Sequence, residues 1–328
     1  MLNRFACLFL LAALLLTVLP TAAESTAAAE PTNTQPQAVF LGDSIATGYL
    51  LEDYDTQAYA ALLSETLGAA ATNLAVNGAT SGDLLTALET ERYQRAVEAA
   101  DFIFISIGGN NFLRRLADWV SAIPGELPSD FAAVVDDGVA AFEKDFPAIL
   151  RTLKAQNPAA TIVVQTIYNP YAILRIPTGD GLLCDYLERQ INRLNLILRA
   201  VHLKNPAAFL LADVAKAFKE AEDPQLCNST LVPFNLDPHP SAKGHRLIAD
   251  TLLATLEKEG FVPVVSPFPS STTTAVLPAS TVPSTLTSTA PAQPQQPSAA
   301  FPWIPVGISG VLLIAVILVL LKCRFRRR

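Results

Sequence analysis

The chain has 328 residues, of which 51% are hydrophobic and 16% are charged, and its formal net charge at pH 7 is −7. This length would allow two domains, but both ends differ in composition from the middle, so we expect one folded domain. Six of the 23 lysines and arginines lie in these ends, leaving 17 against 30 acidic residues, about −13, in the central part. An acidic surface of this kind disfavours nucleic acid as a partner.

Residues 1–23 have the pattern of a secretory signal peptide. Arg4 precedes an apolar run over residues 5–19, and small residues follow at positions 21–23. The run is shorter than the ~20 residues that usually cross a bilayer, so a cleaved signal peptide is favoured over an uncleaved anchor. Both alternatives predict export of the chain that follows.

Residues 301–321 contain no charged side chain and are long enough to cross a membrane. A helix over this segment would extend about 31 Å, close to the thickness of the hydrocarbon core. Trp303 stands at its outer end, and residues 322–328 contain five lysines and arginines. The positive-inside rule therefore predicts a single-pass cell-membrane protein with a basic cytoplasmic tail and an extracellular central domain.

Residues 261–300 separate the predicted domain from the predicted membrane helix. They contain no charged residue and are rich in proline, serine and threonine. This composition cannot form a packed core, and in an extended conformation it could reach as much as about 120 Å. We expect a stalk here, which limits the folded domain to residues 37–260.

Two of the four cysteines, Cys184 and Cys227, fall in the central part of the chain. An oxidising compartment would favour one disulfide between them. The alternative is a pair of buried free thiols, because sequence does not give the distance between the two side chains.

Five short apolar runs alternate with segments of helical period in the central part of the chain. The runs cover residues 38–41, 71–76, 102–107, 162–167 and 208–212. Continuous apolar runs are typical of parallel strands with both faces buried. Between them, residues 182–201 place their apolar side chains on one face at a spacing of 3.6, as expected of a crossover helix. The pattern predicts a three-layer α/β/α sandwich that binds ligands beyond the carboxyl ends of its strands.

Polar and small residues follow the first three predicted strands. Ser44 follows the first, Gly78 the second and Asn110 the third. A serine hydroxyl at this edge could act as a nucleophile, and a glycine N–H and an asparagine amide could bind a developing oxyanion. Each residue could instead belong to an ordinary turn or helix cap.

A serine nucleophile needs a base, and the chain has three histidines: His202, His239 and His245. His202 lies near the end of a helical segment with no acid close by, and His245 lies one turn into the last predicted helix. His239 lies between two prolines, with Asp237 two residues before it. The rigid loop and nearby carboxylate favour His239 as the base.

In these four positions the chain resembles the GDSL, or SGNH, hydrolase family, whose four sequence blocks contribute a serine, a glycine, an asparagine and a histidine. The corresponding residues are Ser44, Gly78, Asn110 and His239, in the family's order. The resemblance implies a flavodoxin-like sandwich in which Ser44 attacks an ester carbonyl. It also implies an oxyanion hole made of the main-chain N–H groups of Ser44 and Gly78 and the Asn110 amide, with no metal or cofactor.

The chain departs from the family pattern at two positions. Asn111 stands where the family generally has an aspartate, and Leu236 stands three residues before the histidine, where the family has its acid. Asp237 could orient His239 from a loop shortened by one residue. Alternatively, a main-chain carbonyl could hold the ring and leave a Ser–His dyad.

The sequence thus predicts a cell-surface serine esterase acting on a lipid, an acylated glycan or a small ester. The alternative, based on the two departures, is a catalytically weak or inactive module that binds a glycan or lipid. The sequence leaves open both the acyl chain length and the oligomeric state.

Overall fold

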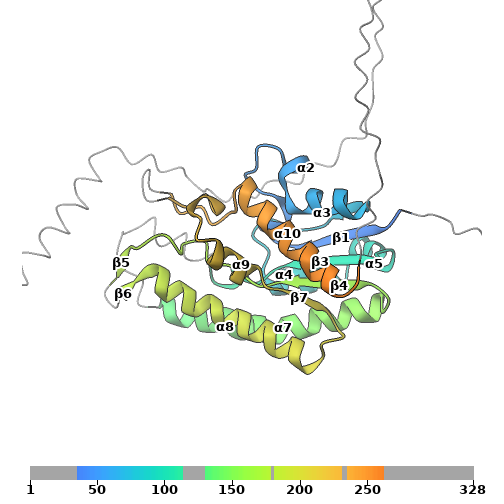
Figure 1. Ribbon diagram of the computed structural model, residues 1–328. Coiled ribbons are helices and arrows are strands. Elements are labelled where there is room, and N and C mark those ends of the chain that lie inside the picture. The colour runs from blue at the N-terminus through green and yellow to red at the C-terminus, as the bar shows by residue number, and fades with distance from the viewer. Residues whose placement is uncertain (1–34, 114–129, 179–180, 231–234, 262–328) are drawn as a thin grey trace, which may run out of the picture. The chain divides into compact units, whose positions relative to one another are not determined.

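The computed structural model describes residues 35–113, 130–178, 181–230 and 235–261 (Figure 1). The predicted signal peptide, stalk, membrane helix and cytoplasmic tail lie outside these residues, apart from Phe261 at the start of the stalk. Within the described ranges, no helix combines the length and apolar character needed to cross a membrane.

A parallel sheet of five strands forms the centre of the fold. Its strands are β1 (Gln37–Gly42), β2 (Ala70–Asn73), β3 (Phe102–Ser106), β4 (Thr161–Gln165) and β7 (Leu210–Ala212). They lie in the order β2-β1-β3-β4-β7, and each neighbouring pair is parallel. The order is that of a flavodoxin-like sheet, so the predicted fold class is confirmed.

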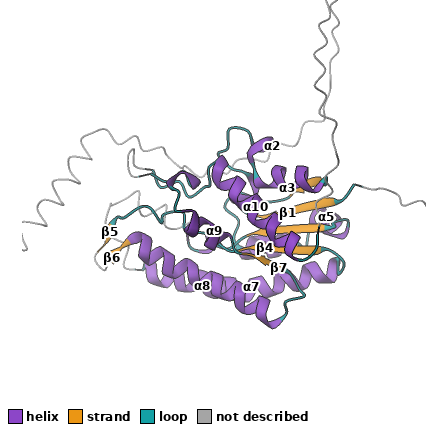
Figure 2. Ribbon diagram, viewed as in Figure 1, coloured by secondary structure: helices purple, strands orange, loops and turns teal. Residues whose placement is uncertain are grey.

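Helices cover both faces of this sheet, as Figure 2 shows. The predicted crossover helix over residues 182–201 is confirmed as α8 (Leu183–Lys204). The remaining elements are α1 (Ser44–Thr47), α2 (Tyr54–Gln57), α3 (Tyr59–Leu67), α4 (Ser81–Ala87), α5 (Glu91–Glu98), η1 (Gly109–Asn111), α7 (Phe131–Gln156), β5 (Pro177–Thr178), β6 (Gly181–Leu182), α9 (Val214–Ala221), η2 (Pro224–Leu226) and α10 (Ala242–Lys258).

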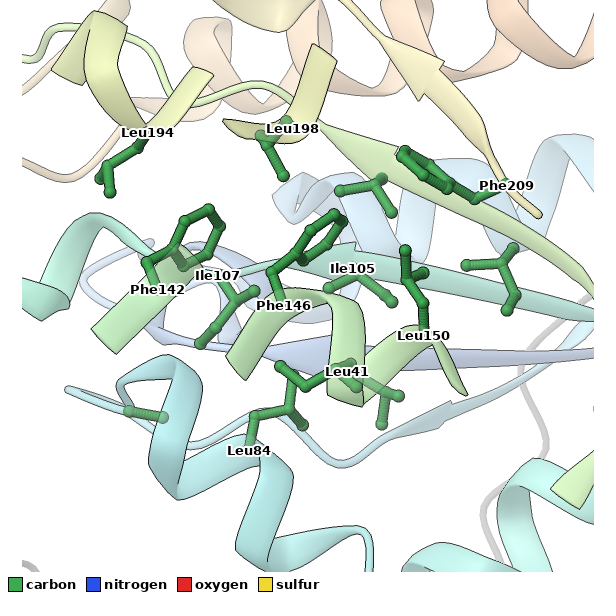
Figure 3. Packing of buried hydrophobic residues seen from close by; sticks show 14 of the residues in the cluster. Leu41, Leu84, Ile105, Ile107, Phe142, Phe146, Leu150, Leu194, Leu198 and Phe209 are labelled. Atoms are coloured by element: carbon green, nitrogen blue, oxygen red, sulfur yellow. The ribbon is translucent and has the colours of Figure 1, made fainter. Parts of the chain in front are cut away.

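Alternate residues of the central strands enter two separate hydrophobic clusters. Leu41 and Ile105 pack with Phe146 of α7 and Leu198 of α8 (Figure 3). Phe40 points to the other face and joins the cluster that includes α3 and α10. A fully buried side chain of this size stabilises the fold by roughly 1.5–3 kcal/mol. The two clusters therefore fix the register of the strands whose ends carry the site.

The second strand differs from its prediction. We expected a buried strand over residues 71–76, but β2 ends at Asn73 and three of its four residues are exposed. The reason is its position at the edge of the sheet, where only β1 lies beside it. The chain beyond Asn73 still follows β1, because the Leu74 N–H donates to Phe40 O and the Val76 N–H donates to Gly42 O.

Candidate active site

Ser44 lies directly beyond the carboxyl end of β1, where the chain turns from the strand into α1. Gly42 has a φ of +130°, and a Cβ there would lie 1.8 Å from Ser106 O, so only glycine fits this position. Asp43 caps α1 by accepting a hydrogen bond from the Ile45 N–H at 3.1 Å. Ser44 is only 9% exposed. The turn thus holds the hydroxyl in one place at the edge of the sheet.

His239 approaches Ser44 from a loop 195 residues further along the chain. Its Nε2 atom lies 2.9 Å from Ser44 Oγ, which is hydrogen-bonding distance. The ring of Tyr49 packs edge-on against the imidazole at 5.0 Å between ring centres. His239 is 4% exposed, so this contact is shielded from water.

Asp237 lies on the other side of the imidazole. Its Oδ1 atom is 2.5 Å from His239 Nδ1 and also accepts the main-chain N–H of His239 at 3.0 Å. A carboxylate two residues before a main-chain N–H forms an Asx turn, and here the same oxygen also reaches the ring. This geometry explains how an acid at the displaced position can orient the histidine. Of the two alternatives, the structure contains the contact with Asp237.

The charge of Asp237 decides which nitrogen of His239 carries the proton. Burial raises the pKa of Asp237, but hydrogen bonds from the side chain and main chain of His239 and from the Asn228 amide hold that pKa below its usual value. An ionised carboxylate only accepts hydrogen bonds, so Nδ1 carries the proton. Nε2 is then an acceptor that faces the Ser44 hydroxyl.

Residues not anticipated from the sequence hold the loop of Asp237 and His239 in place. The phenol of Tyr168 donates to Pro238 O at 3.0 Å, and that of Tyr171 donates to Leu236 O at 3.1 Å. Asn228 Nδ2 donates to Asp237 Oδ2 at 3.0 Å. These partners are far apart in the sequence, and only the position of the two tyrosines after β4 gave any signal of their role.

The two candidate oxyanion residues other than Ser44 lie on neighbouring segments. Gly78 has a φ of +78°, and a Cβ at this position would meet nothing within 4 Å, so backbone conformation rather than space favours glycine. Asn110, in η1, donates from Nδ2 to Ala79 O at 3.2 Å. The structure therefore brings the ends of β2 and β3 together beside the end of β1.

The other two histidines lie in packing positions away from Ser44. His245 is fully buried and accepts the Tyr59 N–H at Nδ1, and burial lowers its pKa to about 4. His202 lies in the last turn of α8, with its ring against Phe209. His239 is the histidine in contact with Ser44.

The predicted disulfide between Cys184 and Cys227 is wrong, because both thiols are free. Cys184 lies at the start of α8, whereas Cys227 follows η2, and both border one cavity of about 400 Å³. The two thiols therefore lie on separate elements of the wall of this cavity. Burial raises the pKa of Cys227 to about 12, which keeps that thiol protonated.

No group of three or more histidine, cysteine, aspartate or glutamate side chains within the described residues is arranged to hold a metal ion. The functional groups gathered at the sheet edge are instead a hydroxyl, an imidazole and a carboxylate in hydrogen-bonded order. This is the set of groups with which many hydrolases activate a serine.

The fold is an α/β/α sandwich around a parallel sheet, and Ser44, His239 and Asp237 lie in contact at the carboxyl edge of that sheet. The sequence model of the GDSL-like lipase/acylhydrolase family matches residues 40–247, more than half of the chain. The chain belongs to this family.

Similar proteins match this chain across most of their own length. An uncharacterized protein of Bacillus subtilis (strain 168), YpmR, is 23% identical over 255 residues, covering 74% of this chain and 91% of that protein. The crystal structure of phospholipase A1 from Streptomyces albidoflavus NA297 superposes with a TM-score of 0.52 at 20% identity, covering 67% of this chain and 99% of the other. The crystal structure of the lipase Lip_vut3 from a goat rumen metagenome superposes with a TM-score of 0.51 at 20% identity, covering 67% of this chain and 97% of the other.

Proposed function

We propose that the protein is a serine esterase in which Ser44 is the nucleophile, His239 the general base and Asp237 the acid that orients it. The observation that carries this proposal is the continuous chain of contacts from Asp237 through both ring nitrogens of His239 to Ser44 Oγ. Membership of the GDSL-like lipase/acylhydrolase family supports hydrolysis of an ester rather than another use of the serine.

In the proposed reaction, Ser44 Oγ bonds to the ester carbonyl carbon while its proton moves to His239 Nε2. The carbonyl electrons move onto the oxygen, and collapse of this intermediate expels the alcohol, which takes the proton from Nε2. Water then repeats the sequence on the acyl-enzyme and releases the acid. Asp237 stays ionised and stabilises the positive charge that forms on the ring.

The negative oxygen of the intermediate needs hydrogen-bond donors. We assign this role to the main-chain N–H groups of Ser44 and Gly78 and to the side-chain amide of Asn110. An amide has two N–H bonds, so the bond from Asn110 to Ala79 O leaves a second hydrogen for the oxyanion. Each such donor contributes about 2.7–4 kcal/mol to catalysis.

A panel of p-nitrophenyl esters from acetate to palmitate tests this function and defines the acyl group. The full-length protein should hydrolyse at least one ester, and Ser44→Ala should reduce turnover to the background rate. Preference for palmitate would favour a lipid substrate, and preference for acetate a deacetylase. Equal turnover by Ser44→Ala, or none by the native protein, would contradict the esterase proposal.

The alternative of an inactive binding module rested on Asn111 and on the displaced acid. The Asp237 to His239 contact favours the enzyme, because the displaced carboxylate still reaches the ring. Glycan or lipid binding without hydrolysis of any ester in the panel would support the module instead.

We also propose that the domain acts outside the cell, anchored by residues 301–321. The support is the sequence pattern of both ends. In intact cells, an external protease should remove the domain, and a chain ending at residue 300 should be recovered from the medium. Retention of the shortened chain inside the cell would contradict this location.

A further inference from the structure

Asn111, the residue at which the chain departs from its family, makes hydrogen bonds to two other segments. Its Oδ1 atom accepts the Ser81 main-chain N–H at 3.1 Å. Its Nδ2 atom donates to Ser81 Oγ at 2.8 Å and to Gly138 O at 3.2 Å. One side chain in η1 therefore joins the start of α4 to the N-terminal third of α7.

The direction of these hydrogen bonds is determined by Asp145 of α7. Ser81 Oγ donates its single proton to Asp145 Oδ2 at 2.9 Å. A carboxylate oxygen can only accept, so Ser81 Oγ must in turn accept from its other partner, Asn111. Residue 111 must consequently provide a donor as long as residue 145 accepts the proton of Ser81 Oγ.

The segments joined in this way carry two of the three proposed donors of the oxyanion hole, the Gly78 N–H and the Asn110 amide. Gly78 lies three residues before Ser81, and Asn110 immediately precedes Asn111. Helix α7 backs this turn closely, since a Cβ at Gly138 would lie 2.4 Å from Asn111 O. Ser81 is fully buried, so its polar atoms have no competing water.

We propose that Asn111 is a positioning residue for the oxyanion hole and that Asn111 and Asp145 form a matched donor and acceptor pair through Ser81. This inference rests on the proposed esterase function. It explains the departure from the family pattern: an aspartate at position 111 would offer no proton to Ser81 Oγ or Gly138 O. It would also place a second carboxylate on the hydroxyl that Asp145 already holds.

The test is a reciprocal exchange measured with the best ester of the panel. Asn111→Asp should lower kcat by about 10-fold or more with KM within about twofold, because the donors act mainly on the transition state. Adding Asp145→Asn should recover at least about threefold in kcat, since the new amide can donate to Ser81 Oγ, which then donates to the carboxylate introduced at position 111. Recovery is incomplete because Gly138 O stays without the donor.

Asp137 provides the matched control, because it lies on the same helix and borders the same cavity as Asn111 and Asp145. Asp137→Asn removes the same charge without touching Ser81, so combined with Asn111→Asp it should not recover activity. The proposal would be overturned if Asp145→Asn and Asp137→Asn restored the kcat of Asn111→Asp equally. A native kcat in Asn111→Asp would overturn it too.

Two further outcomes are informative. If Asn111→Asp does not fold, the same comparison is made on the yield of soluble protein, which Asp145→Asn must restore and Asp137→Asn must not. If native protein and Ser44→Ala both lack turnover, the proposed function fails. The matched pair is then tested by a double-mutant cycle of Asn111→Asp and Asp145→Asn on the free energy of unfolding in denaturant. A coupling energy of zero would overturn the matched pair as well.

Discussion

At the scale of single residues, the spacing of Asp237 and His239 along the chain did not decide whether the carboxylate contacts the imidazole. The displaced position of Asp237 left its role open in the sequence. In the folded loop, an Asx turn brings one carboxylate oxygen within reach of both the main-chain N–H and the ring of His239. The choice of Ser44 and Asn110 required only their positions after predicted strands, and that of His239 its flanking prolines and nearby acid. The contact with Asp237 required the loop geometry.

Replacing Asp237 by Asn should lower kcat by ~10⁴, as expected when the acid of a serine triad loses its charge and no longer fixes the tautomer of the histidine. Asp250→Asn, an exposed acid on α10, is the control and should leave kcat unchanged. Steady-state kinetics on the preferred ester measures both variants. A loss of only a few-fold would favour a dyad held by a main-chain carbonyl.

Asp43 gives a prediction about pH. Burial raises the pKa of its carboxyl from 3.8 to about 7. Its neutral form is therefore favoured in the folded state, so its contribution to stability is present at pH 4 and is lost as the pH rises through 7. Asp43→Asn keeps an oxygen for the Ile45 N–H but does not titrate. In denaturant unfolding, the free energy of unfolding of the native protein minus that of Asp43→Asn should fall from pH 4 to pH 8. A difference that stays constant over this range would contradict the prediction.

At the scale of secondary-structure elements, the site depends on how three strand ends turn. The sequence predicted these turns from glycines and polar residues after apolar runs. It could not predict the partners that hold these turns and the loop of His239, because Asp145, Tyr168 and Tyr171 lie on segments that meet the site only after folding. The edge position of β2 was missed for a similar reason, since burial depends on neighbouring strands and not on the strand's own composition.

Gly78→Ala tests the turn after β2. An alanine would be strained at φ +78°, and relaxing this strain would move the proposed N–H donor, so we expect a ~10-fold lower kcat. Gly68→Ala is a matched control, because Gly68 also has a positive φ with open space around its Cβ but ends α3. Both variants should lose about 1 kcal/mol in unfolding free energy, and only the first should lose activity. Equal activity in both would remove Gly78 from the oxyanion hole.

At the scale of the whole molecule, five apolar runs alternating with amphipathic segments were sufficient to predict the parallel sandwich. Side chains on both faces of β1, β3 and β4 enter two buried clusters, which is why those runs lack polar residues. The cysteine pairing could not be predicted in this way, because it depends on the positions of α8 and the segment after η2 around a cavity.

Because Cys184 and Cys227 are free, the domain does not depend on a covalent link for its stability. The midpoint of thermal unfolding should be the same with and without a reducing agent. Removing a native disulfide typically costs about 2–5 kcal/mol, so a clear decrease of the midpoint on reduction would show that a bond forms between them.

The central claim, that Ser44 is a nucleophile activated by His239, is tested most directly by a fluorophosphonate probe with intact-mass and peptide mapping. The probe should add one phosphonyl group to the native protein at Ser44, labelling should be absent in Ser44→Ala, and His239→Ala should react far more slowly. Equal labelling of Ser44→Ala, or an adduct mapped to another residue, would contradict it.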